Sequence, residues 1–290
     1  MPYPSALKLA SLRLPPAGLL GAGLSAPILR ARELPLVFGT GSHGHLFARD
    51  LIAMPHFLFA GGQNEKKAFL QALVASLLAN RAPSEFKLAL VDSAAADFAV
   101  FAGLPHLASP IAKSQSEALS ALEAAAAEMD RRYSLIAKVK GRNIVWYNAH
   151  LGELKHQDAS LEALSRLVVF VGDLSSLDKQ SVDILVRLAQ LGAPCGIHCI
   201  VGTTSAVPSV VSNVILGNFT CRACMKVGTA EESVNMLGLA GAEQIANPGE
   251  MLFLPRPVAQ GGEILRVQAA FPSEFALQSL CAWWKAHASA

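Results

Sequence analysis

The sequence predicts an α/β protein in which helices cover both faces of a mainly parallel sheet, giving three layers. Continuous apolar runs of strand length occupy residues 86–91, 167–171 and 197–202, and such runs are typical of strands that are buried on both faces. Helix-forming segments separate these runs, and strands that alternate with helices favour a parallel sheet. A third observation is a strand at residues 56–60 that leads through two glycines into a helix.

The expected elements follow one another along most of the chain. Residues 1–32 are interpreted as a tail or linker, because Pro15 and Pro16 interrupt their apolar patches, and residues 33–287 are expected to form the folded domain. The expected strands and helices are a hairpin-like pair at 34–51, strand 56–60, helix 65–80, strand 86–91, helix 114–140, strand 167–171, helix 177–191, strand 197–203, strand 221–227, helix 231–239, strand 250–254 and helix 273–287. Residues 141–160 are polar, and we expect them to form a loop.

Composition bounds the class of protein. The 290 residues are 52% hydrophobic and 16% charged, which is enough for a full core. No apolar run reaches the ~18–20 residues of a transmembrane helix, and no signal-peptide cleavage site is evident, so we expect a cytoplasmic chain without a membrane segment. A net charge of +2 neither demands nor excludes nucleic acid.

The five cysteines raise the question of a metal site. Cys221 and Cys224 form a C-x-x-C pair, and Cys195 and Cys199 could complete four zinc ligands. Both segments have the character of strands, however, and a buried cysteine behaves as a small apolar residue. We therefore assign no metal ligand and expect reduced thiols.

The turn after strand 56–60 has the context of a phosphate-binding P-loop, with a strand before it and a helix after it. This context narrows the fold to a RecA-like three-layer sandwich. The motif G-x-x-x-x-G-K-[ST] itself is broken, because Lys66 and Ala68 stand where glycine and a hydroxyl residue are required. The candidate nucleotide-binding residues are Gly61, Gly62, Gln63, Asn64, Glu65, Lys66, Lys67 and Ala68.

Several short segments, in order and at matching spacing from about residue 34 to residue 285, resemble the motor domain of FtsK/SpoIIIE DNA translocases. They are residues 35–39 with 49–56, 91–92 with 103–107, 128–133, 141–143 with 147–148, 196–198, 240–243 and 248–253. The resemblance implies a RecA-like motor of a ring-shaped, ATP-driven pump for double-stranded DNA. Related secretion ATPases and HerA-type helicases share this core.

The resemblance also identifies positions where this chain departs from the family. Asn64 replaces a glycine of the P-loop, whereas Lys67 keeps the position of the phosphate-binding lysine. In the Walker B segment, Gly172 stands at the metal-organising aspartate and Asp173 at the catalytic glutamate. Thr204 replaces the glutamine that senses phosphate, and residues 192–194 lack the cationic residue that serves a neighbouring subunit in the family.

The first hypothesis from these departures is a pseudo-ATPase. It would be an FtsK-like motor domain with a structural or regulatory role in a DNA-translocation, cell-division, chromosome-segregation or related bacterial assembly. The alternatives are an active translocase with an altered site that uses Lys67 and Asp173, and a protein-binding module that has lost ATP and DNA. The resemblance implies homo- or hetero-oligomers with FtsK-like subunits and leaves double-stranded DNA open as a partner. Cofactor binding is expected to be limited to weak ATP or ADP.

Other polar residues have a ligand-binding and a structural interpretation. Asp92 ends a strand at the edge where such folds bind ligands, or it caps the following turn. Arg131 and Arg132 contact a neighbouring subunit or pair with Glu128 on their own helix. Arg222 matches a family position, for which we expect a structural or interface role.

Overall fold

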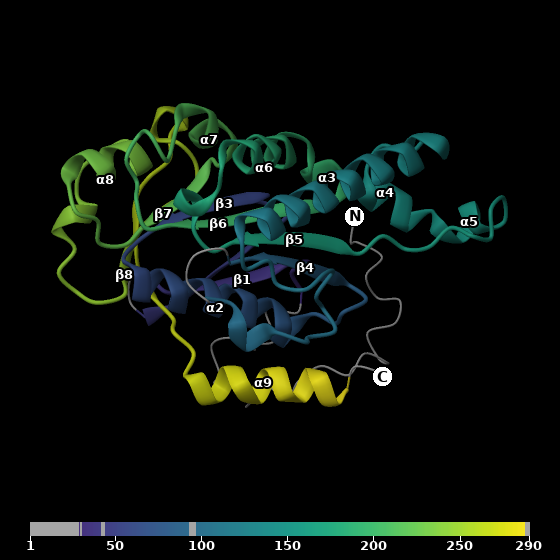
Figure 1. Ribbon diagram of the computed structural model, residues 1–290, viewed down its shortest axis with the longest axis horizontal. Helices are drawn as coiled ribbons and strands as arrows, with labels where there is room; N and C mark the ends of the chain where they lie inside the picture. Colours follow the sequence, from purple (N-terminus) through teal and green to yellow (C-terminus); the bar gives the residue numbers. More distant parts are fainter. Residues whose placement is uncertain (1–28, 30, 42–43, 93–96, 288–290) are drawn as a thin grey trace.

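One mixed sheet organises the protein. The computed structural model describes residues 29, 31–41, 44–92 and 97–287. Within this part of the chain the sheet has nine strands in the order β2-β1-β9-β8-β7-β3-β6-β5-β4. Helices lie on both faces (Figure 1), so the expected α/β sandwich is confirmed. The tail expected at residues 1–32 lies mostly outside the described residues and stays a prediction.

The half of the sheet that carries the candidate site is parallel. Its strands are β7 (Cys221–Cys224), β3 (His56–Ala60), β6 (Ile197–Thr203), β5 (Arg166–Val171) and β4 (Phe86–Val91). Register pairs Ala60 with Thr203 and Val91 with Val171, so the carboxyl ends of these strands lie along one edge. The segments that follow them therefore converge at this edge.

The other half is antiparallel and joins the first through β7. It consists of β8 (Glu250–Leu254), β9 (Leu265–Ala269), β1 (Pro35–Thr40) and β2 (Leu46–Asp50). The hairpin expected at residues 34–51 is confirmed as β1 and β2. Strand β9 was not predicted from the sequence, although its five residues alternate between apolar and polar side chains, a pattern that indicates a half-buried strand.

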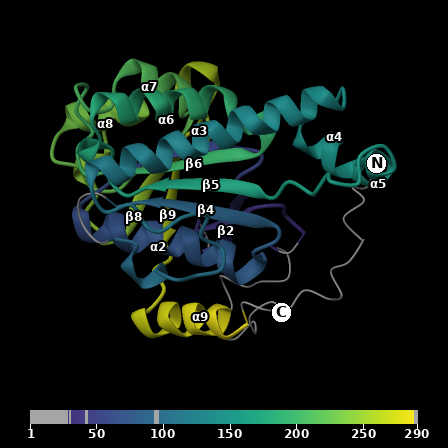
Figure 2. The same ribbon diagram turned by 45° about the vertical axis from the view of Figure 1, so that its right-hand side comes forward.

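The handedness of the crossovers fixes which helix covers which face. The chain passes from β3 to the edge strand β4 and then returns through β5 to β6, so right-handed connections put the first helix and the next two on opposite faces. Figures 1 and 2 show α2 (Gln63–Asn80) on one side, and α3 (Gln115–Lys138) with α6 (Lys179–Leu191) on the other. The terminal helix α9 (Glu274–Ala286) packs outside α2, where the Trp284 indole N–H donates to the Leu78 carbonyl at 2.9 Å.

The core consists of a large apolar cluster on each face of the sheet. Val169, Cys199 and Leu185 belong to the cluster under α3 and α6, whereas Phe57 and Phe69 belong to the cluster around α2. Among the described helices, none is long and apolar enough to cross a bilayer.

The polar stretch at residues 141–160 is helical in its middle part, so the loop expected there is wrong for residues 144–155. Helices α4 (Ile144–Ala149) and α5 (Leu151–Lys155) occupy it. The Asn143 side chain accepts a hydrogen bond from the Trp146 N–H at 2.9 Å and caps α4. Buried Ile144, Tyr147 and Leu154 anchor both helices to the core, which overrides the polar composition.

Two further short helices, α7 (Asn213–Asn218) and α8 (Ala230–Leu237), are tied together by Arg222 of β7. Its guanidinium donates to the carbonyls of Leu216, Phe219 and Met236 at 2.7, 2.7 and 3.0 Å. These carbonyls lie at helix ends, where no intrahelical donor is available. Arg222 therefore has the structural role that was one of its two expected roles.

Candidate functional site: a closed P-loop-like edge

The turn that should cradle phosphate is shorter than expected. Helix α2 begins at Gln63, two residues before the expected start, and only Gly61 and Gly62 remain as loop. The Lys66 N–H donates to the Gly62 carbonyl at 2.8 Å, so this N–H is used inside the helix. Asn64 has no positive φ, and the left-handed conformation that asparagine tolerates is not used here.

Residue type explains the early helix. A P-loop needs glycines where backbone conformation is unusual or where a Cβ would collide with phosphate. This chain has Gln63, Asn64 and Glu65 instead, which adopt ordinary helical conformations. The Glu65 carboxylate also accepts a hydrogen bond from the Gly249 N–H at 3.0 Å, which ties the first turn of α2 to the start of β8.

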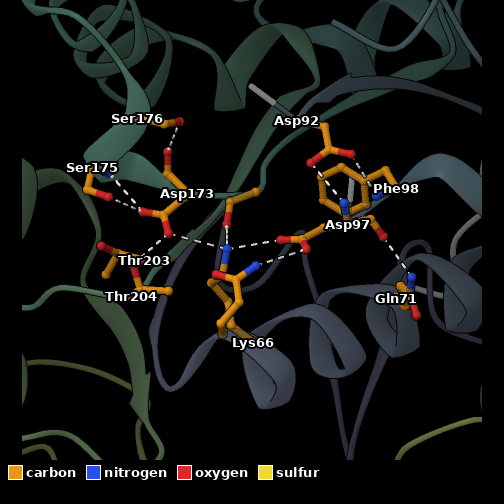
Figure 3. A network of polar contacts seen from close by, with 12 residues as sticks. Lys66, Gln71, Asp92, Asp97, Phe98, Asp173, Ser175, Ser176, Thr203 and Thr204 are labelled. Carbon is orange, nitrogen blue, oxygen red and sulfur yellow. Dashed lines mark hydrogen bonds and ion pairs between the residues drawn. The ribbon is translucent and has the colours of Figure 1, made fainter. Parts of the chain in front are cut away.

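Lys66 turns inward and is completely buried (Figure 3). Its Nζ lies 2.9 Å from Asp97 Oδ2 and 2.8 Å from the Gly172 carbonyl oxygen. A third oxygen, Asp173 Oδ2, lies 3.3 Å away. The ammonium therefore donates hydrogen bonds to Asp97 and Gly172 and makes an ion pair with Asp173.

Asp97 supplies one side of this arrangement and is not among the residues predicted from the sequence. Its Oδ1 accepts from Gln63 Nε2 at 3.2 Å, and its carbonyl accepts from Gln71 Nε2 at 2.7 Å. Burial raises the pKa of the Asp97 carboxyl, against the lowering effect of Lys66 and, more weakly, of Lys67. Asp97 follows a run of small residues with no recognisable motif, so no pattern in a single sequence identifies it.

Asp173 supplies the other side. Ser175 donates to Asp173 Oδ1 through its N–H and its hydroxyl, at 3.0 and 2.7 Å, and the Thr204 hydroxyl donates to Oδ2 at 2.8 Å. Burial alone would raise the pKa of Asp173, but these hydrogen bonds and the Lys66 ammonium hold it below its ordinary value. The carboxylate is ionised at neutral pH and nearly saturated with donors.

The structure thus brings together Lys66, Gly172, Asp173 and Thr204, four of the positions singled out from the sequence. Gln63 joins them through Asp97, whereas Asn64 is exposed and Glu65 reaches β8. Lys67 and Ala68 are half-buried on α2. The cluster joins the start of α2 to the segments that follow β4, β5 and β6 at the carboxyl edge of the sheet.

The remaining polar candidates have structural contacts. Both oxygens of Asp92 accept backbone N–H groups, from Asp97 and Phe98, at 2.9 Å, so Asp92 caps the following turn. The guanidinium groups of Arg131 and Arg132 pair with Glu128 at 2.6 and 2.7 Å, as expected for neighbours on one helix.

The cysteines lie in the core. All five are buried and free. Burial raises the pKa of the Cys195 thiol to about 11 and of the Cys221 thiol to about 12, which disfavours the thiolate that zinc requires. Among the described residues, no group of three or more His, Cys, Asp or Glu side chains is placed to hold a metal ion.

A parallel sheet with a glycine turn and helix after β3 and acidic or hydroxyl residues after β5 and β6 defines a P-loop NTPase-type domain. Solved structures support this fold. The cytoplasmic domain of the type VII secretion ATPase EccC of Thermomonospora curvata is 20% identical with a TM-score of 0.71, covering 85% of this chain and 30% of that chain. EssC (ATPases 2 and 3) of Geobacillus thermodenitrificans is 14% identical with a TM-score of 0.70, covering 88% of this chain and 48% of that chain.

Sequence relatives identify the family more closely. Residues 29–210 match the model of the FtsK/SpoIIIE family. The DNA translocase FtsK of Helicobacter pylori (strain J99 / ATCC 700824) is 33% identical over 270 residues, which cover 91% of this chain and 31% of the relative. The FtsK of Lactiplantibacillus plantarum is 31% identical, with coverage of 91% and 34%. The chain therefore belongs to the FtsK/SpoIIIE family, and it spans about a third of the length of these relatives.

Proposed function

We propose that this chain is a pseudo-ATPase, an FtsK-like motor domain that keeps the fold and acts as a structural or regulatory subunit beside other FtsK-like subunits in a bacterial DNA-translocation or cell-division assembly. The observation that carries the proposal is the Lys66 ammonium, which makes 2.9 and 2.8 Å contacts with Asp97 and Gly172 at the carboxyl edge of the sheet. P-loop enzymes use this edge for the phosphates and the metal ion.

Loss of chemistry at several independent positions supports the proposal. Ala68 has no hydroxyl for Mg²⁺, Gly172 has no carboxylate, and Thr204 is bound to Asp173. Phosphoryl transfer depends on metal and donor groups that stabilise the developing charge, each worth several kcal/mol. Because several of the groups that act together in ATP hydrolysis are lost, an inactive site is favoured over an altered site that is still active.

The decisive experiment is a phosphate-release assay on the purified chain with ATP, Mg²⁺ and double-stranded DNA. We expect turnover at background for the wild type. The variants Lys67→Met and Asp173→Asn serve as controls and should release phosphate at the same rate. Turnover near about 1 s⁻¹, the low end of ordinary enzymes, that falls in either variant would establish the altered-site translocase instead.

Nucleotide binding gives a second test. Any residual affinity for ATP is expected to be weak and nearly independent of Mg²⁺, because residues 68 and 172 supply no metal-binding side chain. Calorimetric titrations with ATP alone and with ATP plus Mg²⁺ measure this. A gain in affinity of about tenfold or more on adding Mg²⁺, equivalent to about 1.4 kcal/mol, would argue for an intact metal site.

A further inference from the structure

We propose that the Lys66 side chain is a built-in counter-cation, which fills the place of a soluble cation between Asp97 and Asp173 and locks the carboxyl edge of the sheet without a ligand. This inference deepens the proposed function and rests on it. The counter-cation proposal concerns the contacts that stabilise this edge of the sheet, whereas the pseudo-ATPase proposal concerns the loss of ATP hydrolysis there.

Three oxygens surround the Lys66 ammonium. Asp97 Oδ2 and the Gly172 carbonyl oxygen accept hydrogen bonds from it at 2.9 and 2.8 Å, and Asp173 Oδ2 makes an ion pair with it at 3.3 Å. Lys66 itself is 0% exposed, and the Asp97 and Asp173 side chains are 1% and 6% exposed. A cation held by oxygens on several sides and shielded from water is in the environment of a bound ion rather than of a surface salt bridge.

Without the Lys66 ammonium, two buried carboxyl groups would lose their ion-pair partner. Asp92 lies close enough to act on Asp97 electrostatically. Among the described residues, Lys66 is the cation in ion-pair contact with Asp97 and Asp173. Removing one partner of a buried ion pair leaves an uncompensated charge in a poorly solvated place. A cation at this edge stabilises the ionised carboxylates, and the chain supplies its own.

The contacts of Lys66 join distant parts of the chain. Lys66 comes from α2 and Asp97 from the segment after β4, and Asp173 lies on the other side of the ammonium (Figure 3). Gly172 and Asp173 directly follow β5. Thr204, after β6, joins through Asp173 at 2.8 Å. Four segments that are far apart in the sequence are thus held by one ammonium and its partners, and we expect this junction to keep its form in the absence of nucleotide.

The test begins with Lys66→Met, which keeps an unbranched side chain of similar length and removes the charge. We expect Tm to fall by about 10 °C, from the usual cost of breaking a buried pair. Lys67→Met removes the same charge one residue further along α2 and should change Tm by no more than about 2 °C. Equal effects of the two variants would overturn the proposal.

A triple variant distinguishes the effect of unpaired charge on stability from the effect of altered packing. Lys66→Met combined with Asp97→Asn and Asp173→Asn removes the carboxylates together with the ammonium, and should be more stable than Lys66→Met alone. If Lys66→Met does not accumulate as folded protein, recovery of a cooperative transition in the triple variant supports the proposal. Absence of recovery contradicts it.

A soluble cation provides the direct readout. In Lys66→Ala the ammonium is gone and space is left beside oxygens of the kind that bind Mn²⁺. We expect millimolar Mn²⁺ to raise the Tm of Lys66→Ala by several degrees, and the bound ion to be visible by electron paramagnetic resonance. The wild type and Lys67→Met should not respond.

The outcomes distinguish the two proposals. An equal Mn²⁺ response in the wild type, or no response in Lys66→Ala, overturns the counter-cation while leaving an inactive wild type a pseudo-ATPase. ATP turnover by the wild type overturns the pseudo-ATPase, whatever the Lys66 variants do.

Discussion

Acidification from pH 7 to pH 4.5 is expected to destabilise this protein steeply, by up to about 4 kcal/mol per pH unit at its steepest. Three buried histidines are the cause. Burial lowers the pKa of His56 to about 4 and of His106 to about 3. Burial, with nearby Arg166 and His56, lowers the pKa of His198 to about 3. All three are neutral in the folded protein at neutral pH.

The direction of this pH dependence follows from the protonation of the histidines in the folded and the unfolded chain. The unfolded chain protonates each histidine near its ordinary value of about 6.5, whereas the folded chain resists protonation until the pH is far lower. Stability is therefore retained above about pH 6.5 and lost as the pH falls towards 4, with each histidine contributing up to about 1.4 kcal/mol per unit. The low pKa of Glu128, caused by its arginine partners, adds a loss only below its ordinary value of 4.5. The raised pKa of Asp97 acts in the opposite direction.

Urea unfolding at pH values between 7.5 and 4.5 measures the slope of the free energy of unfolding against pH. His106→Phe keeps a planar ring against Phe86 and Trp284 and should reduce the slope by about 1.4 kcal/mol per unit. The exposed His156→Gln should leave it unchanged. A wild-type slope under about 1 kcal/mol per unit between pH 6 and pH 4.5, or a slope unaffected in His106→Phe, would contradict the assignment.

The fold could be predicted where one signal dominates. Strand β6 is predicted at residues 197–203 and occupies them, because residues 197–202 read as a mainly apolar run and all seven residues are buried. Helices α4 and α5 could not be predicted in this way, because they owe their structure to packing of Ile144, Tyr147 and Leu154 in the core, which local composition does not record. Strand β9 has the weaker signal of apolar and polar residues that alternate over only five positions.

The site could be predicted in its positions and not in its contacts. The order of strands brings residues 66, 172 and 204 to one edge, and the sequence predicts all three as site positions because they follow strands of the parallel half. The direction of the Lys66 side chain was not predictable, because it depends on Asp97, which lies 31 residues further along the chain and belongs to no motif. A buried lysine is identified by its partners, and those are known only from the fold.

The second large effect is expected from restoring the P-loop and the metal ligands. Asn64→Gly, Lys66→Gly, Ala68→Ser and Gly172→Asp together should convert a chain without Mg²⁺-dependent affinity into one that binds Mg·ATP at about millimolar concentration or below, a free energy of about −4 kcal/mol. The two glycines free the first turn of α2 from its helical constraint, so that backbone N–H groups can face phosphate. The changes at positions 68 and 172 would supply a hydroxyl and a carboxylate as metal ligands.

The surroundings of residue 172 decide how this variant behaves without ligand. A Cβ at Gly172 would lie 3.4 Å from the Val91 carbonyl oxygen and 3.6 Å from oxygens of Asp92 and Asp97. The new carboxylate therefore joins two others just as Lys66 is removed. We expect a lower Tm without ligand and a rise of several degrees with Mg·ATP, since a ligand that binds only the folded state stabilises it.

Adding Asp97→Asn to the restored chain removes one of the crowded carboxylates, and should recover stability without abolishing Mg·ATP binding. Binding is expected before hydrolysis, because Asp173 is one methylene shorter than glutamate and Thr204 has no amide. Isothermal titration of the restored chain, with Lys66→Gly alone as the control, measures the gain. A restored chain that folds normally yet shows no affinity at millimolar Mg·ATP would mean that residues 61–68 cannot adopt P-loop geometry in this fold. The closed edge would then be a property of the whole domain and not of these four side chains.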